Sequence, residues 1–339
     1  MSIAPVPFET RYILPPIEVV EDSAAEVRAK QDRIRALCAE TNAVLLAHHY
    51  QRPEIQDVAD FVGDSLRLCQ AAAKGSASVI VFCGVHFMAE TACILCPDKT
   101  VLLPDPNAGC SLAAAVTAAE LRSWKARFPD AVVVAYINTS AEVKAESDYC
   151  CTSANAAKVV AAIPKERPIL FLPDKFLASV IARQTGRANI IAYPGYCHIH
   201  KMIRAEDVAA VLEEHPDIEL LLHPECGCVS SCMERALDGT LPTSRTFFLS
   251  TEGMLRHVAA SPEREFAVGT ETGILHGLRR AHPEREFHAV NSGAVCAFMK
   301  TITLDKVIRS LESMAPQVRV PAETAGRARH AIDRMMELA

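Results

Sequence analysis

The 339-residue sequence contains no apolar run as long as the roughly 18 to 20 residues that a membrane-spanning helix needs. Its first residues lack a basic start followed by an apolar core, which argues against a secretory signal peptide. No block of lysine and arginine stands out and the net charge is −6, which argues against nucleic acid or an anionic membrane as a partner. We therefore expect a cytoplasmic protein with neither kind of partner.

Cysteine, in contrast, is abundant, with 13 residues in the chain. An odd number of cysteines without an export signal argues against a disulfide framework. Many of them should be small buried hydrophobic residues, and their spacing must show which ones bind metal. Hydrophobic residues make up 50 % of the sequence, which is ample for the cores of two or three domains.

Short apolar runs alternate with helical stretches along most of the chain. Continuously apolar runs suit parallel strands that are covered on both faces, and their alternation with helices indicates an α/β fold. We expect a helix over 24–41 and a helical tail over 301–338 with a break near 316–321, and we read Cys150 and Cys151 as the start of a helix. The expected strands are 43–48, 78–83, 100–103, 131–137, 168–172, 189–193, 218–222, 246–249, 265–269 and 287–290.

Polar residues recur at nearly equal intervals, each time at the end of an apolar run. The polar pairs are His48 with Tyr50, Tyr136 with Asn138, and His223 with Glu225. From His48 to Tyr136 is 88 positions, and from Tyr136 to His223 is 87. Three cysteines keep a similar spacing, with intervals of 87 and 99 positions between Cys110, Cys197 and Cys296. Equal spacing of matching features predicts internal repeats.

The third repeat contains an insertion. A hydroxyl residue follows the polar pair's first member by 17 positions in the first two repeats, at Ser65 and Ser153. In the third repeat the residue 17 positions after His223 is Thr240, but Ser250 or Thr251, ten or eleven positions after Thr240, is the better match. The insertion therefore lies between Glu225 and Ser250. The sequence thus predicts three similar αβα domains, each a three-layer sandwich. The predicted division is an arm and helix over 1–35, domains over 36–110, 111–197 and 198–300, and a C-terminal helical stretch over 301–339 that packs back on the first domain.

Three repeat-equivalent cysteines can converge on a pseudo-threefold axis. Three thiolates cannot complete a tetrahedral zinc site, but they can hold three irons of a [4Fe–4S] cluster and leave the fourth iron open. An open iron is a Lewis acid that can bind a hydroxyl, carbonyl or carboxylate group. The alternative is that Cys110, Cys197 and Cys296 are three ordinary buried cysteines. Gly109 and Gly195 precede two of them closely, as the approach of backbone to a bulky cofactor requires.

The other cysteines carry weaker signals. Cys93 and Cys96 form a CxxC pair inside an apolar helical stretch, where packing is the favoured role. A CxCxxxC run could bind zinc or form a redox disulfide, although only His223 offers itself as a fourth ligand. We call its members, Cys226, Cys228 and Cys232, the CxCxxxC cysteines.

The polar residues at the strand ends supply acids, bases and hydrogen-bond donors at three equivalent points. In parallel sheets the ligand crevice lies beyond the carboxyl ends of the strands, so we expect these residues to share one site. Hydroxyl residues at expected helix N-termini favour an anionic ligand with several carboxylates or a phosphate, because free N–H groups and the helix dipole attract negative charge. Ordinary N-capping explains the same hydroxyls and is compatible with that role.

Motifs over about 40–310 resemble those of the quinolinate synthase family and occur in the family's order. They are AHHYQ, VADFVGDSL, FMAETA, AGCSLA, AYINTSAEVKAESDYCCTSANA, PGYCHIH, HPEC, STEGM and TETGILHGL. The resemblance implies three αβα domains around a pseudo-threefold axis, with a [4Fe–4S] cluster on Cys110, Cys197 and Cys296. It implies a transferase of NAD biosynthesis that condenses iminoaspartate with dihydroxyacetone phosphate to quinolinate and releases phosphate and two waters. L-aspartate oxidase is the implied functional partner.

The resemblance also implies roles for individual residues. Glu225 and Tyr50 are implied as the acid/base pair for tautomerisation and dehydration, with His223 and His48 as further catalytic residues. Because the reaction involves no net redox change, the cluster is implied to act as a Lewis acid. The implied substrate-binding residues are His48, Ser65, Tyr136, Asn138, Ser153, His223, Glu225, Ser250 and Thr251.

Two positions depart from the family pattern. His49 stands where many members have asparagine, and its side chain should point to the other face. Some members carry a CxxCxxC run at the last cluster cysteine, whereas here Gly293 and Val290 stand three and six positions before Cys296. Cys296 is therefore the only candidate ligand in that stretch.

Two other functions are also compatible with the sequence. One is an enzyme with the same plan and a three-cysteine cluster, such as the reductase that forms isoprenoid diphosphates, although the HPEC and AYINTS motifs argue against it. The other is a non-enzymatic metal sensor built on the CxCxxxC cysteines, for which the sequence shows no DNA-binding module. Four irons in the purified protein would indicate the synthase, and zinc the sensor.

Overall fold

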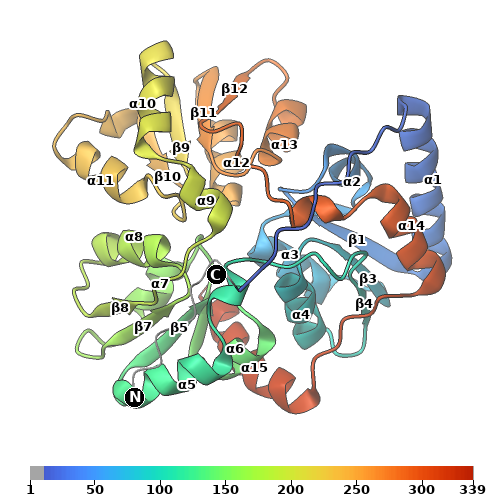
Figure 1. Ribbon diagram of the computed structural model, residues 1–339, viewed down its shortest axis with the longest axis horizontal. Helices are drawn as coiled ribbons and strands as arrows, with labels where there is room; N and C mark the ends of the chain where they lie inside the picture. The colour runs from blue at the N-terminus through green and yellow to red at the C-terminus, as the bar shows by residue number, and fades with distance from the viewer. Residues whose placement is uncertain (1–10, 339) are drawn as a thin grey trace. The chain divides into compact units, whose positions relative to one another are not determined.

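The structure, a computed structural model, describes residues 11–338. Within these residues, twelve strands form three parallel sheets of four strands each, and helices flank the sheets (Figure 1). This arrangement confirms the predicted α/β fold with three similar αβα domains. None of the helices in the described part of the chain is long and apolar enough to cross a membrane.

The described chain divides into two compact units, and we describe each by itself. Unit 1 comprises 11–122, Ile137–Ser147 and Cys296–Ile332. Unit 2 comprises Ser123–Tyr136, Asp148–Val295 and 333–338.

The first sheet lies in unit 1 and has the strand order β2-β1-β3-β4. Its strands are β1 (Ala43–His48), β2 (Phe61–Gly63), β3 (Val79–Cys83) and β4 (Thr100–Leu102), and the helices before and between them are α1 (Ala24–Thr41), α2 (Pro53–Val58), α3 (Ser65–Lys74) and α4 (His86–Leu95). Every residue of β3 is buried, because its sequence VIVFC is apolar on both faces and helices cover both. The predicted helix over 24–41 is confirmed; Ser23 and Glu26 form a capping box at its start.

The second and third sheets lie in unit 2 and repeat the same strand order, β6-β5-β7-β8 and β10-β9-β11-β12. The strands of the second sheet are β5 (Val132–Tyr136), β6 (Tyr149–Cys151), β7 (Ile169–Leu172) and β8 (Ile190–Ala192). Those of the third are β9 (Glu219–Leu222), β10 (Thr246–Phe248), β11 (Glu265–Gly269) and β12 (Glu286–Ala289). An identical order in all three sheets is what a threefold internal repeat requires.

Helices connect the strands of these two domains. In chain order, η2 (Ala113–Ala115) and α5 (Ala118–Arg127) precede β5, and α6 (Ala141–Ala145) lies between β5 and β6. Next come α7 (Ala156–Ala161) between β6 and β7, and α8 (Lys175–Thr185) between β7 and β8. Around the third sheet they are α9 (His198–Met202), α10 (Ala205–Glu214), α11 (Val229–Leu237), η3 (Thr243–Arg245), α12 (Thr251–Ala260) and α13 (Ile274–Ala281).

The predicted insertion in the third repeat is confirmed. The second strand of a sheet begins 13 positions after the first strand ends in the first two sheets (48 to 61 and 136 to 149), but 24 positions after it in the third (222 to 246). The extra length includes α11, which has nine residues where α2 has six and α6 has five. Within unit 2, α11 packs on α8, where Arg183 forms an ion pair of 2.8 Å with Glu234 and the hydroxyls of Ser179 and Ser230 lie 3.5 Å apart.

One expectation about local structure is wrong. Cys150 and Cys151 do not begin a helix but belong to β6, where they pair with Ala135 and Tyr136 of β5. The edge strands β2 and β6 had not been expected at all. Each has three residues, too few to stand out as an apolar run.

The C-terminal stretch forms α14 (Leu304–Ser313) and α15 (Ala322–Glu337), so the expected break near 316–321 is confirmed. It is preceded by η4 (Met299–Thr301). In unit 1, α14 packs beside α1 (Figure 1), and the following segment extends the edge of the first sheet. There the Val318 N–H donates to the Val101 carbonyl at 2.9 Å. The residues from Asp333 onward belong to unit 2, where the Arg334 guanidinium lies 3.8 Å from the Tyr149 ring centre.

Candidate active site

A buried polar cluster lies beyond the carboxyl ends of β5 and β9 in unit 2. Tyr136 is the last residue of β5, and His223 and Glu225 directly follow the end of β9. All three side chains are buried, and the Tyr136 hydroxyl donates a hydrogen bond to Glu225 Oε1. His223 Nδ1 lies 3.7 Å from the same carboxylate oxygen, and its Nε2 lies 3.4 Å from the Ser153 hydroxyl. Unit 2 thus brings together four of the residues that the repeat had selected.

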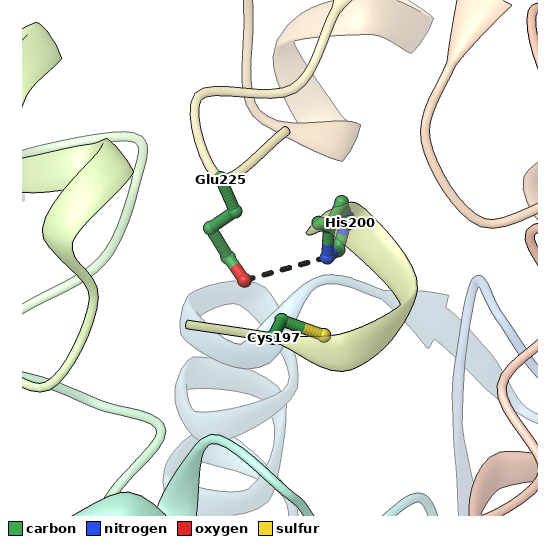
Figure 2. Close-up of side chains that lie close together, drawn as sticks. All are labelled: Cys197, His200 and Glu225. Atoms are coloured by element: carbon green, nitrogen blue, oxygen red, sulfur yellow. Dashed lines mark ion pairs between the residues drawn. The ribbon is translucent and has the colours of Figure 1, made fainter. Parts of the chain in front are cut away.

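Two further residues complete this cluster, and both come from the start of α9. Cys197 is the N-cap residue of α9 and His200 lies in its first turn. Figure 2 shows them beside Glu225, with a dashed line joining His200 and Glu225; the distance between His200 Nδ1 and Glu225 Oε2 is 3.5 Å. One donor atom from each of Cys197, His200 and Glu225 lies within 4.8 Å of the other two. The group therefore combines a thiol, an imidazole and a carboxyl group at one point.

The neighbours of His200 fix the orientation of its ring. The ring stacks on that of His223 with a centroid separation of 4.8 Å, and Nε2 lies 3.0 Å from the Thr270 hydroxyl. Burial lowers the pKa of His200 to about 3, so the imidazole is neutral at physiological pH. A neutral imidazole can accept a proton or a hydrogen bond as well as donate one.

Two carboxyl groups in unit 2 are buried close to this imidazole pair. Burial raises the pKa of Glu225 above its usual range, and the negative charge of Asp174 raises it further. Burial also raises the pKa of Asp174, whose carboxylate accepts a hydrogen bond from the N–H group of Leu177 at 2.8 Å. Asp174 therefore caps α8. A carboxyl group with a raised pKa is suited to both taking up and releasing a proton near neutral pH.

Unit 1 carries the corresponding pair at the end of β1. His48 is the last residue of β1 and Tyr50 follows it; both side chains are buried. The Tyr50 N–H donates to His48 Nδ1 at 3.1 Å, and the two rings meet edge to face with centroids 4.5 Å apart. The Lys300 ammonium donates to the Tyr50 carbonyl, and the Gln51 amide lies 3.7 Å from the sulfur of Met299. The segment that follows Cys296 therefore packs on the end of β1.

The three cysteines with repeat spacing occupy equivalent places in the chain. Cys110 follows β4, Cys197 follows β8 and Cys296 follows β12, so each comes after the fourth strand of a sheet. All three are partly exposed, whereas most of the other cysteines are buried. In unit 1 the Phe298 ring would lie 3.3 Å from a Cβ atom at Gly109, so the segments that carry Cys110 and Cys296 lie in contact. Accessible thiols beside closely packed backbone fit the expectation of a bulky sulfur-ligated group. We refer to these three residues as the cluster cysteines.

The remaining cysteines have the features of packed thiols. Cys93 donates from Sγ to the Val318 carbonyl at 3.1 Å, and burial raises the pKa of this thiol to about 12. The CxCxxxC cysteines are fully buried at the start of α11. Cys226 donates from Sγ to the Gly269 carbonyl at 3.1 Å, and burial raises the pKa of its thiol. Buried thiols with raised pKa values are poor metal ligands and poor nucleophiles.

Three of the hydroxyl residues predicted to bind substrate lie at the starts of helices, and the predicted amide residue lies in the loop after a strand. Ser65 is the first residue of α3, and Ser250 is the N-cap of α12, where its hydroxyl accepts the Gly253 N–H at 3.1 Å. Thr251 begins α12, and no hydrogen bond or ion pair links Ser250 or Thr251 to Glu225 within the described residues. Asn138, in unit 1, is half-buried, and its Oδ1 is shielded from solvent without a hydrogen-bond partner in the described part of the chain. Such an unsatisfied acceptor is typical of a ligand contact.

Two residues of the unit 2 cluster are absent from the predictions made from the sequence. His200 lies three positions after Cys197, and this Cys-x-x-His spacing on a helix could have suggested a shared face. Asp174 follows the end of β7 and could have been found by the same strand-end argument that selected Glu225.

Comparison with known proteins identifies the family. Residues 32–337 match the family model described as Quinolinate synthetase A protein. The chain belongs to the quinolinate synthase family. A quinolinate synthase of Thermus thermophilus is 54 % identical over 308 residues, which cover 91 % of this chain and 97 % of that protein. Quinolinate synthase of Pyrobaculum aerophilum is 52 % identical over 310 residues (91 % and 99 %), and that of Mycobacterium sp. (strain KMS) 51 % over 317 residues (94 % and 94 %).

These relatives confirm the quinolinate synthase resemblance inferred from the motifs. They favour this family over the isoprenoid diphosphate reductase and over the metal sensor. The buried Glu225 cluster therefore lies in a chain whose full-length relatives carry the name of a biosynthetic enzyme.

Proposed function

We propose that this protein is a quinolinate synthase that condenses iminoaspartate with dihydroxyacetone phosphate to quinolinate, with release of phosphate and two waters. As a transferase of de novo NAD biosynthesis it acts in the cytoplasm, on iminoaspartate that L-aspartate oxidase supplies. The observation that carries this proposal is the 50–54 % identity to proteins named quinolinate synthase over nearly the whole chain. The buried acid/base group around Glu225 supports it, because tautomerisation and dehydration both need proton transfer.

The cluster cysteines are the proposed ligands of a [4Fe–4S] cluster with one open iron. Their equivalent positions after the fourth strand of each sheet and their partial exposure support this assignment. When bound, the cluster supplies a Lewis acid that polarises a substrate oxygen.

Within unit 2, Glu225 is the proposed general base and acid. Its buried carboxyl group can remove a carbon-bound proton during tautomerisation and return a proton to a leaving hydroxyl during dehydration. The Tyr136 hydroxyl donates to Oε1 of Glu225, next to His223, and so holds Oε2 toward the imidazole of His200. Ser153, hydrogen-bonded to His223, is the proposed hydroxyl contact for substrate, and Ser250 and Thr251 at the start of α12 are proposed to hold an anionic group.

Within unit 1, Tyr50 is the proposed partner of Glu225 in acid/base catalysis. His48 accepts the Tyr50 N–H through its Nδ1 and so orients the Tyr50 backbone. Its imidazole is also proposed to contact the substrate. Asn138 is proposed to bind substrate through the Oδ1 that has no partner in the described residues, and Ser65, at the start of α3, to bind a carboxylate or phosphate.

The direct test is the formation of quinolinate by protein purified without oxygen. We expect four irons per chain and quinolinate, detected by mass spectrometry, when dihydroxyacetone phosphate and freshly generated iminoaspartate are supplied together. Omission of either substrate should abolish the product. Zinc in place of iron would favour the metal sensor, and a fully iron-loaded protein that forms no quinolinate would refute the proposed reaction.

A further inference from the structure

A second group of metal-binding side chains lies in the third domain, within unit 2. It consists of His215, the C-cap residue of α10, Glu265, the first residue of β11, and His288 in β12. Glu265 Oε1 lies 2.7 Å from His215 Nδ1 and 2.9 Å from His288 Nε2, and the two imidazole centroids are 4.3 Å apart. Two nitrogen donors therefore face a single carboxylate oxygen.

The fold, rather than the local sequence, gathers these three residues. Glu265 pairs with Glu286 and Ala267 pairs with His288 across the parallel strands β11 and β12. Residues that pair, or that lie two apart on one strand, point to the same face of a sheet, so Glu265 and His288 share a face. His215 reaches the group at the point where α10 ends and the chain turns into β9; this turn is closed by the Ile218 N–H, which donates to the His215 carbonyl at 3.2 Å. Three well-anchored backbone segments thus hold the three side chains.

The hydrogen bonding of the group is incomplete without a further ligand. His288 Nε2 is shielded from solvent and has no aligned hydrogen-bond partner in the described residues, although Glu265 Oε1 lies only 2.9 Å away. The nitrogen and the oxygen are close but do not point along a common N–H···O line. An unsatisfied buried nitrogen next to a carboxylate is expected where both atoms point at a cation.

A comparison with other histidine–carboxylate contacts in unit 2 shows what distinguishes this group. Glu219 accepts from His257 at 2.8 Å and from the Ser261 hydroxyl at 3.0 Å, so its carboxylate is satisfied by one imidazole and one hydroxyl. His282 lies 3.7 Å from Glu284, with no second imidazole in contact with that carboxylate in the described residues. The group at Glu265 differs from both because it adds a second imidazole.

The donor set and its surroundings favour a divalent transition metal. Zinc binds imidazole nitrogen at about 2.0–2.1 Å and carboxylate oxygen at about 2.0–2.2 Å, so the donors of a tetrahedral site lie about 3.3 Å apart. The donor atoms here all lie within 4.8 Å of one another, and the two nitrogen–oxygen distances of 2.7 and 2.9 Å must lengthen to about 3.3 Å when an ion is bound. The negative end of the α10 dipole, with Glu213 and Glu214 in its last turn, adds attraction for a cation.

The group is separate from the Glu225 cluster. Glu265 stands at the amino end of β11, whereas Gly269, at the carboxyl end of the same strand, accepts the N–H of His223. Four residue steps of an extended strand place these ends about 13 Å apart, at opposite edges of the sheet. The side chains of His215, Glu265 and His288 are 29, 38 and 31 % exposed, so solvent can deliver an ion and supply a water as a further ligand.

We propose that His215, Glu265 and His288 bind one zinc-class divalent ion that fixes the end of α10 to β11 and β12. The ion ties together three segments whose side chains meet at this point on the carboxylate of Glu265. Its role is to stabilise the third domain, and its binding does not depend on the proposed synthase reaction.

The test uses protein that carries its iron, freed of loosely bound metal by dialysis against a chelator and then titrated with zinc alone. We expect wild-type protein to bind one more equivalent of zinc than Glu265→Gln and His288→Gln, and zinc to raise the midpoint of thermal unfolding only in the wild type. Zinc-edge X-ray absorption should show nitrogen and oxygen neighbours at about 2.0–2.1 Å and no sulfur at about 2.3 Å. The control His282→Ala, which removes an imidazole from a simple ion pair, should bind zinc like the wild type.

Two results would overturn the proposal. One is equal zinc stoichiometry in the wild type and Glu265→Gln, since this variant keeps the shape of the side chain and removes only its charge. The other is a zinc–sulfur distance in the absorption spectrum, which would assign the bound zinc to cysteine. If His288→Gln does not fold, the comparison between the wild type and Glu265→Gln still decides the question.

Discussion

Replacing Glu225 by glutamine tests the acid/base assignment while leaving the buried cluster intact. In the native protein, one carboxylate oxygen of Glu225 accepts from the Tyr136 hydroxyl and the other lies 3.5 Å from His200 Nδ1. A glutamine amide can reproduce both contacts: its oxygen can accept from Tyr136, and its NH₂ group can donate to the imidazole. Burial keeps His200 neutral, with a pKa of about 3, so its Nδ1 can accept. No buried polar group loses its partner, and the stability of the fold should be unchanged.

What the amide cannot do is transfer a proton. General acid–base catalysis typically contributes about 10² to 10⁴ in rate. We therefore expect turnover of Glu225→Gln to fall by a factor in that range, which corresponds to about 3 to 5 kcal/mol in activation free energy. Iron content, unfolding temperature and the affinity for substrate should stay close to wild-type values.

The assay combines steady-state quinolinate formation, iron analysis and thermal unfolding on anaerobically purified protein. Glu219→Gln is the matched control, because Glu219 is also buried, also contacts an imidazole and stands at the opposite end of β9. This control should keep normal turnover. Near-normal turnover of Glu225→Gln would refute the acid/base role and leave Tyr50 or His223 as the candidate. Loss of iron from Glu225→Gln would instead assign a structural role to Glu225.

Three further predictions concern the cysteines and the glycines. Serine at any one of the cluster cysteines should remove iron and activity together, measured by visible absorbance and product formation, while Cys93→Ser keeps both; the reverse pattern would disprove the ligand assignment. Serine at all three CxCxxxC cysteines should leave iron content unchanged, because their buried thiols do not serve the cluster, and iron loss in this variant would move the metal site into the third domain. Gly227→Ala should destabilise the protein by about 1–3 kcal/mol in chemical unfolding, since its Cβ would lie 2.8 Å from the Lys201 carbonyl oxygen. Gly326→Ala lies in the interior of α15 with open space around the new methyl group, so it should stabilise the protein by about 0.5–1 kcal/mol. Equal effects of the two glycine changes on the free energy of unfolding would contradict the steric argument.

The sequence predicts those parts of the fold that depend on long apolar runs. A strand such as Val79–Cys83 is apolar along its whole length because both of its faces are covered, and this pattern is visible without a structure. The edge strand Phe61–Gly63 has only three residues and an exposed start, so it gives no such pattern. Cys150 and Cys151 were misread for the same reason, because β6 forms by pairing with β5 and not by an apolar pattern of its own.

The residues of the candidate site are likewise only partly predictable from the sequence. Glu225 and Tyr136 are visible in the sequence because the repeat places polar residues at equivalent strand ends. His200 and Asp174 are not among the polar residues that the repeat spacing selected, and the folded chain brings them to the Glu225 cluster. His215, Glu265 and His288 come from three segments with no shared motif, so their proximity depends on the register of β11 and β12 and on the end of α10.

The longer connection in the third repeat has a consequence for how a nearly symmetric chain assembles. Domains built from the same strand order present similar surfaces, and similar surfaces can dock in more than one way. The helix α11 is longer than its counterparts in the first two repeats, and its Glu234 forms an ion pair with Arg183 of α8. A deletion that shortened this connection to 12 residues, the length found in the first two repeats, would restore the symmetry of the repeat and remove this ion pair. We therefore expect loss of the insertion to appear first as misassembled protein rather than as a change in any one domain.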